Sequence, residues 1–226
     1  MTDDGRGHDE SLTLALDAST YAGSVAVLRG ARVVAERTVA MRGEHEERLL
    51  PAVVAALGEA GAVPRAVARV VCGAGPGSFT SLRIAASIAK GVAEGSGATL
   101  LAVPSLALVV AGAQPPLAAG RYVAALDAGR GEWFASVVEH DGDRVVCGHA
   151  RLVSAAALAD LARFEGAPIV GPSRAHGAHE PHARGVAILG GALARADLAT
   201  WEPDYGRLAE AQVKWEAQHG RPLPRV

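Results

Sequence analysis

Short apolar runs separated by turns dominate the first half of the chain and predict a β-sheet. The runs are rich in Val, Leu and Ala, and Arg29-Gly30-Ala31 favours a hairpin between two of them. We predict strands at 12–16, 23–28, 32–39, 67–72 and 99–103.

Two segments between these runs have helical spacing. Residues 44–57 place Leu49, Leu50, Val53, Val54 and Leu57 on one broad face, and Pro51 indicates either the start of the helix or a kink. A second helix is predicted from about 80 to 94, capped by Ser78 or Thr80 and closed by Gly95 and Gly97. Strands alternating with helices predict an α/β layer fold whose sheet is at least partly parallel.

The second half repeats this pattern. Ala15-Leu16-Asp17-Ala18 recurs as Ala125-Leu126-Asp127-Ala128, Ser24-Val25 recurs as Ser136-Val137, and Arg32-Val33-Val34 recurs as Arg144-Val145-Val146. Matches in the same order indicate a duplicated strand–hairpin–helix unit and hence two related lobes. The repeat continues with a helix at 155–163, a strand at 168–170, a loop at 173–184, a helix at 186–195 and a polar helix at 208–218.

Composition narrows the class of protein. The 226 residues carry a net charge of −2, which disfavours unaided binding of nucleic acid, and include only two cysteines, which we interpret as free thiols in a reducing compartment. Residues 1–10 are polar and form a tail without the apolar core of a signal peptide. The longest apolar stretch, 99–113, contains Pro104 and is too short to span a bilayer. We expect a cytoplasmic, soluble protein with no membrane partner.

The loop between residues 73 and 80 is the most informative stretch. The glycines and proline of Gly73-Ala74-Gly75-Pro76-Gly77 permit a sharp turn that exposes N–H groups before a helix N-terminus. This suits phosphate contact and a plain strand-to-helix turn equally well. No Gly-Lys-Ser/Thr follows, and Ser78 replaces the third glycine of the dinucleotide fingerprint, which excludes both of those motifs.

Other polar residues allow a chemical and a structural interpretation. Asp17, followed by Ser19 and Thr20, either holds a hydrated cation near a phosphate or caps a turn. Its counterpart Asp127 lacks the hydroxyl neighbours. Ser78 is interpreted as an N-cap because no Gly-x-Ser-x-Gly elbow surrounds it.

The histidines give no clear metal motif. His176, His179 and His182 recur at every third residue, but Gly177 and Pro181 prevent a regular helix that would align the rings. We favour surface histidines on a loop and assign them no function. His45 has no second ligand one helical turn away, so a contact role is favoured there.

At this point the residues resemble the TsaB family, also called YeaZ. The resemblance is carried by Leu14-Ala-Leu-Asp17-Ala-Ser-Thr20, by Gly75-Pro-Gly-Ser-Phe-Thr80 with Leu82-Arg83-Ile84, and by Leu126-Asp127-Ala128 with Arg130-Gly131-Glu132. Glu44-His45 with Arg48-Leu-Leu-Pro51, Val103-Pro104-Ser105-Leu106 and Pro203-x-Tyr205-x-Arg207 extend it. The match is dense over residues 11–138 and thin beyond them.

The resemblance implies the actin/Hsp70-like ATPase (ASKHA) fold in two lobes. We expect a tail at 1–10, an N-terminal lobe at 11–103 completed by a C-terminal helix near 205–220, and a C-terminal lobe at 104–204. The resemblance also implies that the chain is a non-catalytic partner of the transferase TsaD and acts with the ATPase TsaE. Together they transfer threonylcarbamoyl to the adenosine beside the anticodon of tRNAs reading codons that begin with A. The chain would meet tRNA indirectly and would form a homodimer when alone.

The family's dimer surface is formed by the two helices singled out above, whose small and apolar residues favour close approach. This places the partner interface at His45, Arg48, Leu49, Ala52, Leu82, Arg83 and Ala86. A vestigial nucleotide loop would comprise Asp17, Ser19, Thr20, Gly75, Gly77 and Ser78, with no catalytic residue.

TsaD-like enzymes carry a metal-binding His-x-x-x-His after the strand that corresponds to 100–103, whereas residues 104–113 contain no His, carboxylate or Cys. The chain would therefore need no cofactor and no metal, and ATP and metal would reside on the partner subunits. The alternative is an active nucleotide-dependent kinase or ATPase of the same fold that uses Asp17. A peptidase, a third interpretation, lacks a clear metal site or nucleophile.

Overall fold

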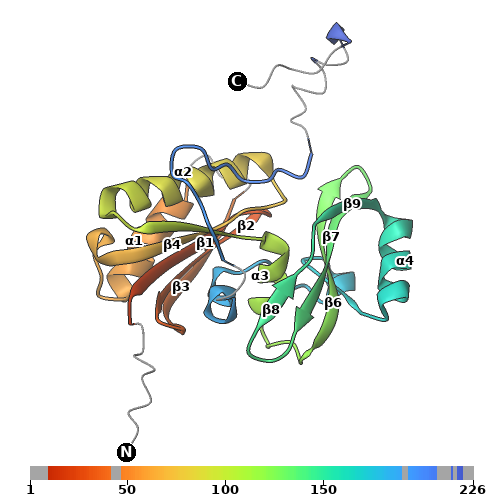
Figure 1. The fold of residues 1–226 in the computed structure, drawn as a ribbon, viewed down its shortest axis with the longest axis horizontal. Coiled ribbons are helices and arrows are strands. Elements are labelled where there is room, and N and C mark those ends of the chain that lie inside the picture. Colours follow the sequence, from red (N-terminus) through yellow and green to blue (C-terminus); the bar gives the residue numbers. More distant parts are fainter. Residues whose placement is uncertain (1–9, 42–46, 190–192, 208–214, 216–217, 221–226) are drawn as a thin grey trace, which may run out of the picture.

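Two mixed β-sheets, each flanked by helices, form the two lobes of the protein (Figure 1). The structure is a computed structural model that describes residues 10–41, 47–189, 193–207, 215 and 218–220. Within these ranges no helix is both long enough and apolar enough to cross a bilayer. The predicted N-terminal tail and most of the helix predicted at 208–218 lie outside the described residues.

The first sheet has six strands in the order β11-β5-β4-β1-β2-β3. β1 pairs antiparallel with β2 and parallel with β4, and β5 runs parallel to β4. The central strand β1 is buried along its whole length, in keeping with its apolar residues Leu12, Leu14, Ala15 and Leu16. The strands are β1 (Leu12–Asp17), β2 (Ala22–Arg29), β3 (Arg32–Ala40), β4 (Val67–Gly73), β5 (Thr99–Val103) and β11 (Ala194–Arg195).

The second sheet repeats the topology of the first. Its order is β10-β6-β7-β8, in which β6 pairs antiparallel with β7 and parallel with β10, as β1 does with β2 and β4. The predicted duplication is therefore seen in the strand order as well as in the sequence. The strands are β6 (Gly120–Gly129), β7 (Glu132–His140), β8 (Val145–Cys147), β9 (Arg151–Ser154), which also pairs with β7, and β10 (Ile169–Val170).

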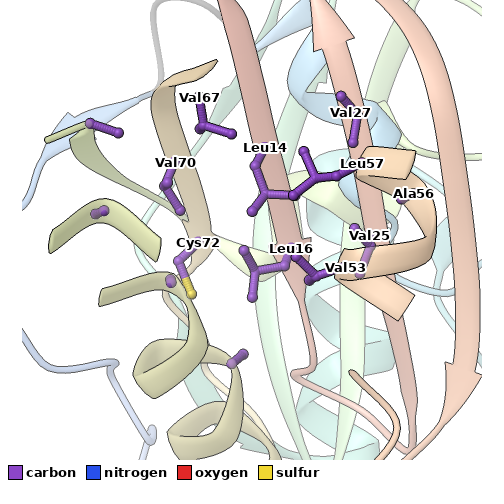
Figure 2. Close-up of a cluster of buried hydrophobic side chains, with 14 of the residues drawn as sticks. Leu14, Leu16, Val25, Val27, Val53, Ala56, Leu57, Val67, Val70 and Cys72 are labelled. Carbon is purple, nitrogen blue, oxygen red and sulfur yellow. The ribbon is translucent and has the colours of Figure 1, made fainter. Parts of the chain in front are cut away.

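Helices cover both faces of each sheet. α1 (Leu49–Glu59) and α2 (Phe79–Ser96) pack on one face of the first sheet, where Leu14, Leu16 and Val25 meet Val53 and Leu57 (Figure 2). α3 (Ser105–Ala111) and the 3₁₀ helix η3 (Ala183–Ile188) fill the space between the sheets. α4 (Ala155–Glu165) covers the outer face of the second sheet.

The start of α1 and the end of α2 are each capped by a residue of the sequence. α1 begins at Leu49, and the Glu47 carboxylate accepts hydrogen bonds from the backbone N–H groups of Leu49 and Leu50. Pro51 therefore lies in the first turn, where its missing N–H costs no hydrogen bond. α2 follows Ser78 and closes at Gly97, whose φ of 73° is the left-handed conformation that glycine favours.

The prediction for residues 186–195 is wrong. In place of a helix, η3 ends at Ile188 and Ala194 and Arg195 form β11, which pairs with β5. The free edge of β5 provides a ladder of hydrogen bonds for this segment, so it joins the first sheet as an edge strand. The expected C-terminal lobe at 104–204 therefore extends too far, because the chain has already returned to the N-terminal lobe by residue 194.

Candidate functional site

The Asp17 carboxylate, at the end of β1, lies wholly inside the protein with an exposed fraction of 0%. Its Oδ1 accepts hydrogen bonds from the Ser19 backbone N–H at 2.9 Å and the Ser19 hydroxyl at 2.8 Å. Its Oδ2 accepts one from the Ser105 hydroxyl at 2.5 Å. Burial raises the pKa of Asp17, and these hydrogen bonds oppose the rise. Asp17 is thus a buried link between β1 and α3, closed to a hydrated cation.

The glycine loop donates its N–H groups inward. Ala74 donates to the Val103 carbonyl at 2.7 Å, Gly75 to the Ser105 hydroxyl at 3.1 Å, and Ser78 to the Ser19 carbonyl at 2.8 Å. The expectation of exposed donors is therefore wrong for these three groups. The turn interpretation of the loop fits this geometry, and these three donors are unavailable to an anion.

Two of the glycines are required by close approach to the strand ends. A Cβ on Gly73 would lie 1.9 Å from Asp17 Oδ2, and one on Gly77 would lie 2.1 Å from the Ser19 carbonyl oxygen. Neither position tolerates a side chain unless the strand end moves. Ser105 completes this network, and sequence analysis did not assign it a role, since nothing local shows that α3 begins beside Asp17.

The lobes enclose a cleft of about 860 Å³, which we call the interlobe cleft. Its walls come from the carboxyl ends of β1 and β6, the start of α2 and the segment 172–180. From the predicted nucleotide loop, Ser19, Thr20, Gly77 and Ser78 line it, while Asp17 and Gly75 do not. The other polar and aromatic residues that line it include Tyr21, Phe79, Asp127, Trp133, Phe134, Glu180, Tyr205 and Arg207.

The segment 203–207 runs across the glycine loop and forms one wall of the cleft. Asp204 donates its N–H to the Ala74 carbonyl at 2.7 Å, and the rings of Tyr205 and Phe79 have centroids 4.5 Å apart. Arg207 forms an ion pair with Glu132 at 3.1 Å. These contacts give a structural role to the Pro-x-Tyr-x-Arg motif, which only the family resemblance had marked.

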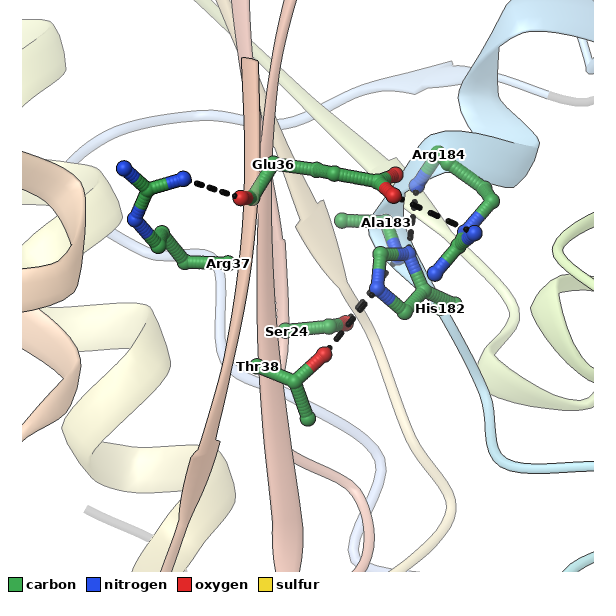
Figure 3. A network of polar contacts seen from close by, with 7 residues as sticks. All are labelled: Ser24, Glu36, Arg37, Thr38, His182, Ala183 and Arg184. Atoms are coloured by element: carbon green, nitrogen blue, oxygen red, sulfur yellow. Dashed lines mark hydrogen bonds and ion pairs between the residues drawn. The ribbon is translucent and has the colours of Figure 1, made fainter. Parts of the chain in front are cut away.

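A second polar network links the first sheet to residues 181–184, and we call it the interlobe clasp (Figure 3). His182 Nδ1 accepts the Arg184 N–H at 3.1 Å, so Nε2 carries the proton and donates to the Thr38 hydroxyl at 3.2 Å. Arg184 pairs with Glu36 at 3.3 Å, and the Ser24 hydroxyl accepts the Ala183 N–H at 3.0 Å. The expected surface histidine is therefore buried at position 182, where burial and the Arg184 charge lower its pKa to about 4.

The other predicted histidines lie apart from this network. His176 packs against the edge of the Trp133 ring, and its pKa is lowered by burial. Among the described residues, no group of three or more His, Cys, Asp or Glu side chains is arranged to hold a metal ion. His45 lies outside the described residues.

The predicted partner interface needs correction at four positions. Leu49, Ala52, Leu82 and Ala86 are buried, because the small and apolar stripes of α1 and α2 pack against each other and the sheet. Arg48 and Arg83 are exposed, as a surface role requires. The two predicted helices remain at the surface, but a different set of their side chains faces outward.

Part of the exposed side of these helices is apolar, and we call this part the α1–α2 surface. Leu50 is 47% exposed and Val54 61% exposed on α1, and Val63 is 63% exposed beyond its end. A hollow of about 860 Å³ joins the two helices there, and a smaller one adjoins it at Leu50 and Ile88. The residues of the α1–α2 surface are Leu50, Val54, Val63, Ile84, Ile88 and Val92.

Comparison with known proteins shows a match over most of the chain. A family model described as "TsaD: tRNA N6-adenosine threonylcarbamoyltransferase" matches residues 39–197. The tRNA threonylcarbamoyladenosine biosynthesis protein TsaB of Bacillus subtilis is 28% identical over 89% of this chain and 96% of its own length. The Escherichia coli protein of the same name is 36% identical over 57% of this chain and 55% of its own.

Solved structures of similar fold agree with these sequence matches. A Pseudomonas aeruginosa protein described as similar to peptidase YeaZ has a TM-score of 0.73 and 28% identity, and covers 87% of this chain and 100% of its own. The chain belongs to the TsaB (YeaZ) family. YeaZ from the same organism gives a TM-score of 0.70 at 27% identity, covering 86% of this chain and 99% of its own. The two-lobed ASKHA fold implied by the sequence resemblance to TsaB is confirmed.

Proposed function

We propose that the chain acts in threonylcarbamoyladenosine modification of tRNA as a non-catalytic partner of a TsaD-type transferase. The apolar α1–α2 surface is the observation that carries the proposal. Side chains such as Val54 and Val63 are more than half exposed, and an apolar patch of this kind on a soluble protein marks a protein–protein contact. The names of the TsaB relatives and the TsaD family match give the reaction in which this contact serves.

The non-catalytic part of the proposal is supported by the Asp17 network. A carboxylate that is buried and bonded to Ser19 and Ser105 is unavailable to a metal-bound nucleotide. The family resemblance implies metal-binding histidines at the position of α3 in TsaD-like enzymes, and α3 contains no His, carboxylate or Cys. In this proposal the chain itself requires no cofactor, and ATP and metal act on the partner subunits, TsaD and TsaE.

Charge supports an indirect role toward tRNA. The net charge of −2 gives the chain no general attraction to phosphates, so the partner would hold the tRNA whose adenosine beside the anticodon is modified. When no partner is present, the same α1–α2 surface would pair two copies of the chain, since a two-fold dimer buries the same patch on both subunits.

Co-purification with a tagged TsaD paralogue tests the proposal. We expect the wild-type chain to be retained, and Leu50→Glu and Val54→Glu to be lost, because each buries an unpaired charge in the contact. Phe164→Glu is the matched control, since Phe164 is 87% exposed on α4 in the other lobe. Retention of both Glu variants at wild-type level would show that the α1–α2 surface is not the contact.

The alternative activity is tested on the isolated chain. We expect no ATP hydrolysis and no threonylcarbamoyl transfer by the purified protein. Tight binding of ATP–Mg with turnover that Asp17→Asn abolishes would favour the nucleotide-dependent enzyme, and would contradict the buried role of Asp17.

A further inference from the structure

We infer that the interlobe cleft is a binding site for an organic cation, a guanidinium or an alkyl ammonium group. The cleft lies where a two-lobed ATPase fold would hold a nucleotide, but the residues present do not fit one. Its lining combines unpaired carboxylates with aromatic rings, which is the chemistry that recognises a positively charged side chain.

The charge balance of the lining favours a cation. Asp127 and Glu180 line the cleft, and neither forms an ion pair with any residue in the described ranges. Asp127 Oδ1 accepts the Gly129 N–H at 2.7 Å, and Glu180 Oε2 accepts the Thr20 hydroxyl at 2.8 Å, so each keeps oxygens for a ligand. Among the described residues of the lining, Arg207 is the one cationic side chain, and it is already paired with Glu132.

Aromatic residues are concentrated in the same cleft. The whole chain has three Phe, three Trp and three Tyr, and five of these nine rings line it: Tyr21, Phe79, Trp133, Phe134 and Tyr205. Arginine side chains already lie over two of them, at 5.5 Å from Phe79 and 5.8 Å from Phe134. The rings therefore serve as partners for guanidinium groups within this protein.

A nucleotide phosphate would meet the wrong groups. The N–H donors of Ala74, Gly75 and Ser78 are occupied by internal carbonyl and hydroxyl oxygens. A phosphate placed between the lobes without a bridging metal ion would face the carboxylates of Asp127 and Glu180, which repel it. The cleft keeps the position of a nucleotide site while its charge has the opposite sign.

Titration of the full chain with a charged and a neutral ligand tests the inference. The probes are N-acetyl-arginine amide and N-acetyl-citrulline amide, which have nearly the same shape but differ in charge. The indole N–H signal of Trp133 in a ¹H–¹⁵N correlation spectrum reports the cleft, and Trp201 and Trp215, which do not line it, are internal controls. We expect a saturable shift of Trp133 with the arginine compound and at least tenfold weaker binding of citrulline.

Two isosteric variants locate the contact. Asp127→Asn and Glu180→Gln keep an oxygen for the Gly129 and Thr20 hydrogen bonds, so the cleft should keep its shape. We expect each to weaken binding of the arginine compound at least fivefold. Glu94→Gln, which removes an exposed carboxylate of α2 outside the cleft, should leave it unchanged.

The source of the cation is distinguished by two further probes. Tighter binding of a Gly-Gly-Arg-Gly-Gly peptide than of spermidine would support a partner's side chain, and the reverse would support a free polyamine. The inference is overturned if the citrulline compound binds as tightly as the arginine compound, or if neither isosteric variant weakens binding. It is also overturned if the Trp133 signal shows tighter binding of ATP–Mg, or of MgCl₂ alone, than of either organic cation. The assay uses the isolated chain, so its outcome is independent of the partner proposed for the α1–α2 surface.

Discussion

Acidification should destabilise the protein through one side chain of the interlobe clasp, His182. Its Nδ1 accepts the Arg184 N–H, and its Nε2–H donates to Thr38 (Figure 3). A second proton would have to be placed on Nδ1, where it would remove the acceptor and face the Arg184 guanidinium. The folded state therefore holds the pKa of His182 near 4, below the ordinary value of 6.5.

The sign and size of the effect follow from this difference in pKa. Between pH 6.5 and pH 4 the unfolded chain binds a proton at His182 that the folded chain does not, so stability falls as the pH falls through this window. Unfolded and folded pKa values of 6.5 and 4 give a loss of about 2 kcal/mol between pH 7 and pH 5.

Urea unfolding at pH 7 and pH 5 measures this loss, with tryptophan fluorescence and circular dichroism as two probes of one transition. His182→Gln, which does not titrate, is the control, because the pH dependence of its free energy of unfolding comes from all the other groups. We expect the wild type to lose about 2 kcal/mol more than the variant. Equal losses in the two proteins would show that His182 is not protected from protonation in the folded state.

Three further outcomes follow from the buried polar groups. Gly73→Ala places a Cβ 1.9 Å from Asp17 Oδ2, and we expect its urea midpoint to fall by the equivalent of about 3 kcal/mol, with soluble yield as a second measure. Ser105→Ala removes the donor to Asp17 and the acceptor of the Gly75 N–H, so we expect the free energy of unfolding in urea to fall by about 2 kcal/mol. A decrease smaller than the experimental error would refute the role of this network. Burial and the Asp17 charge raise the pKa of the Cys72 thiol, so a maleimide at pH 8 should label Cys72 only after urea unfolding, and rapid labelling of the native protein would contradict its burial.

Much of the fold could be predicted because the sequence of each short segment indicates which element it forms. The strand at 99–103 and the helix at 155–163 were predicted from local sequence patterns, and the structure has Thr99–Val103 and Ala155–Glu165 there. The segment 186–195 could not, because its pattern is compatible with a helix and only the edge of β5 selects a strand. The pairing with β5 therefore makes Ala194 and Arg195 a strand, although the local sequence favours a helix.

For the candidate sites too, the local features could be predicted from the sequence and the tertiary contacts could not. The glycine loop was located from its composition, but its role was not, because the oxygens that accept its N–H groups come from Ser19, Val103 and Ser105 in other elements. The two helices of the partner surface were also located, yet Leu49 and Leu82 face inward and Leu50 faces outward. Helical spacing defines an apolar stripe, and where both sides of a helix are apolar it does not say which side meets the sheet.

The pairing of β11 with β5 has a consequence for synthesis on the ribosome. The N-terminal lobe emerges first, but one of its edge strands and the segment that covers Gly75 and Phe79 are made only after the second lobe. Until residues 194–207 emerge, the edge of β5 remains unpaired and able to take up a strand from another chain. The first lobe to be translated is therefore the last to be completed, and a nascent chain stalled before residue 194 would carry this open edge.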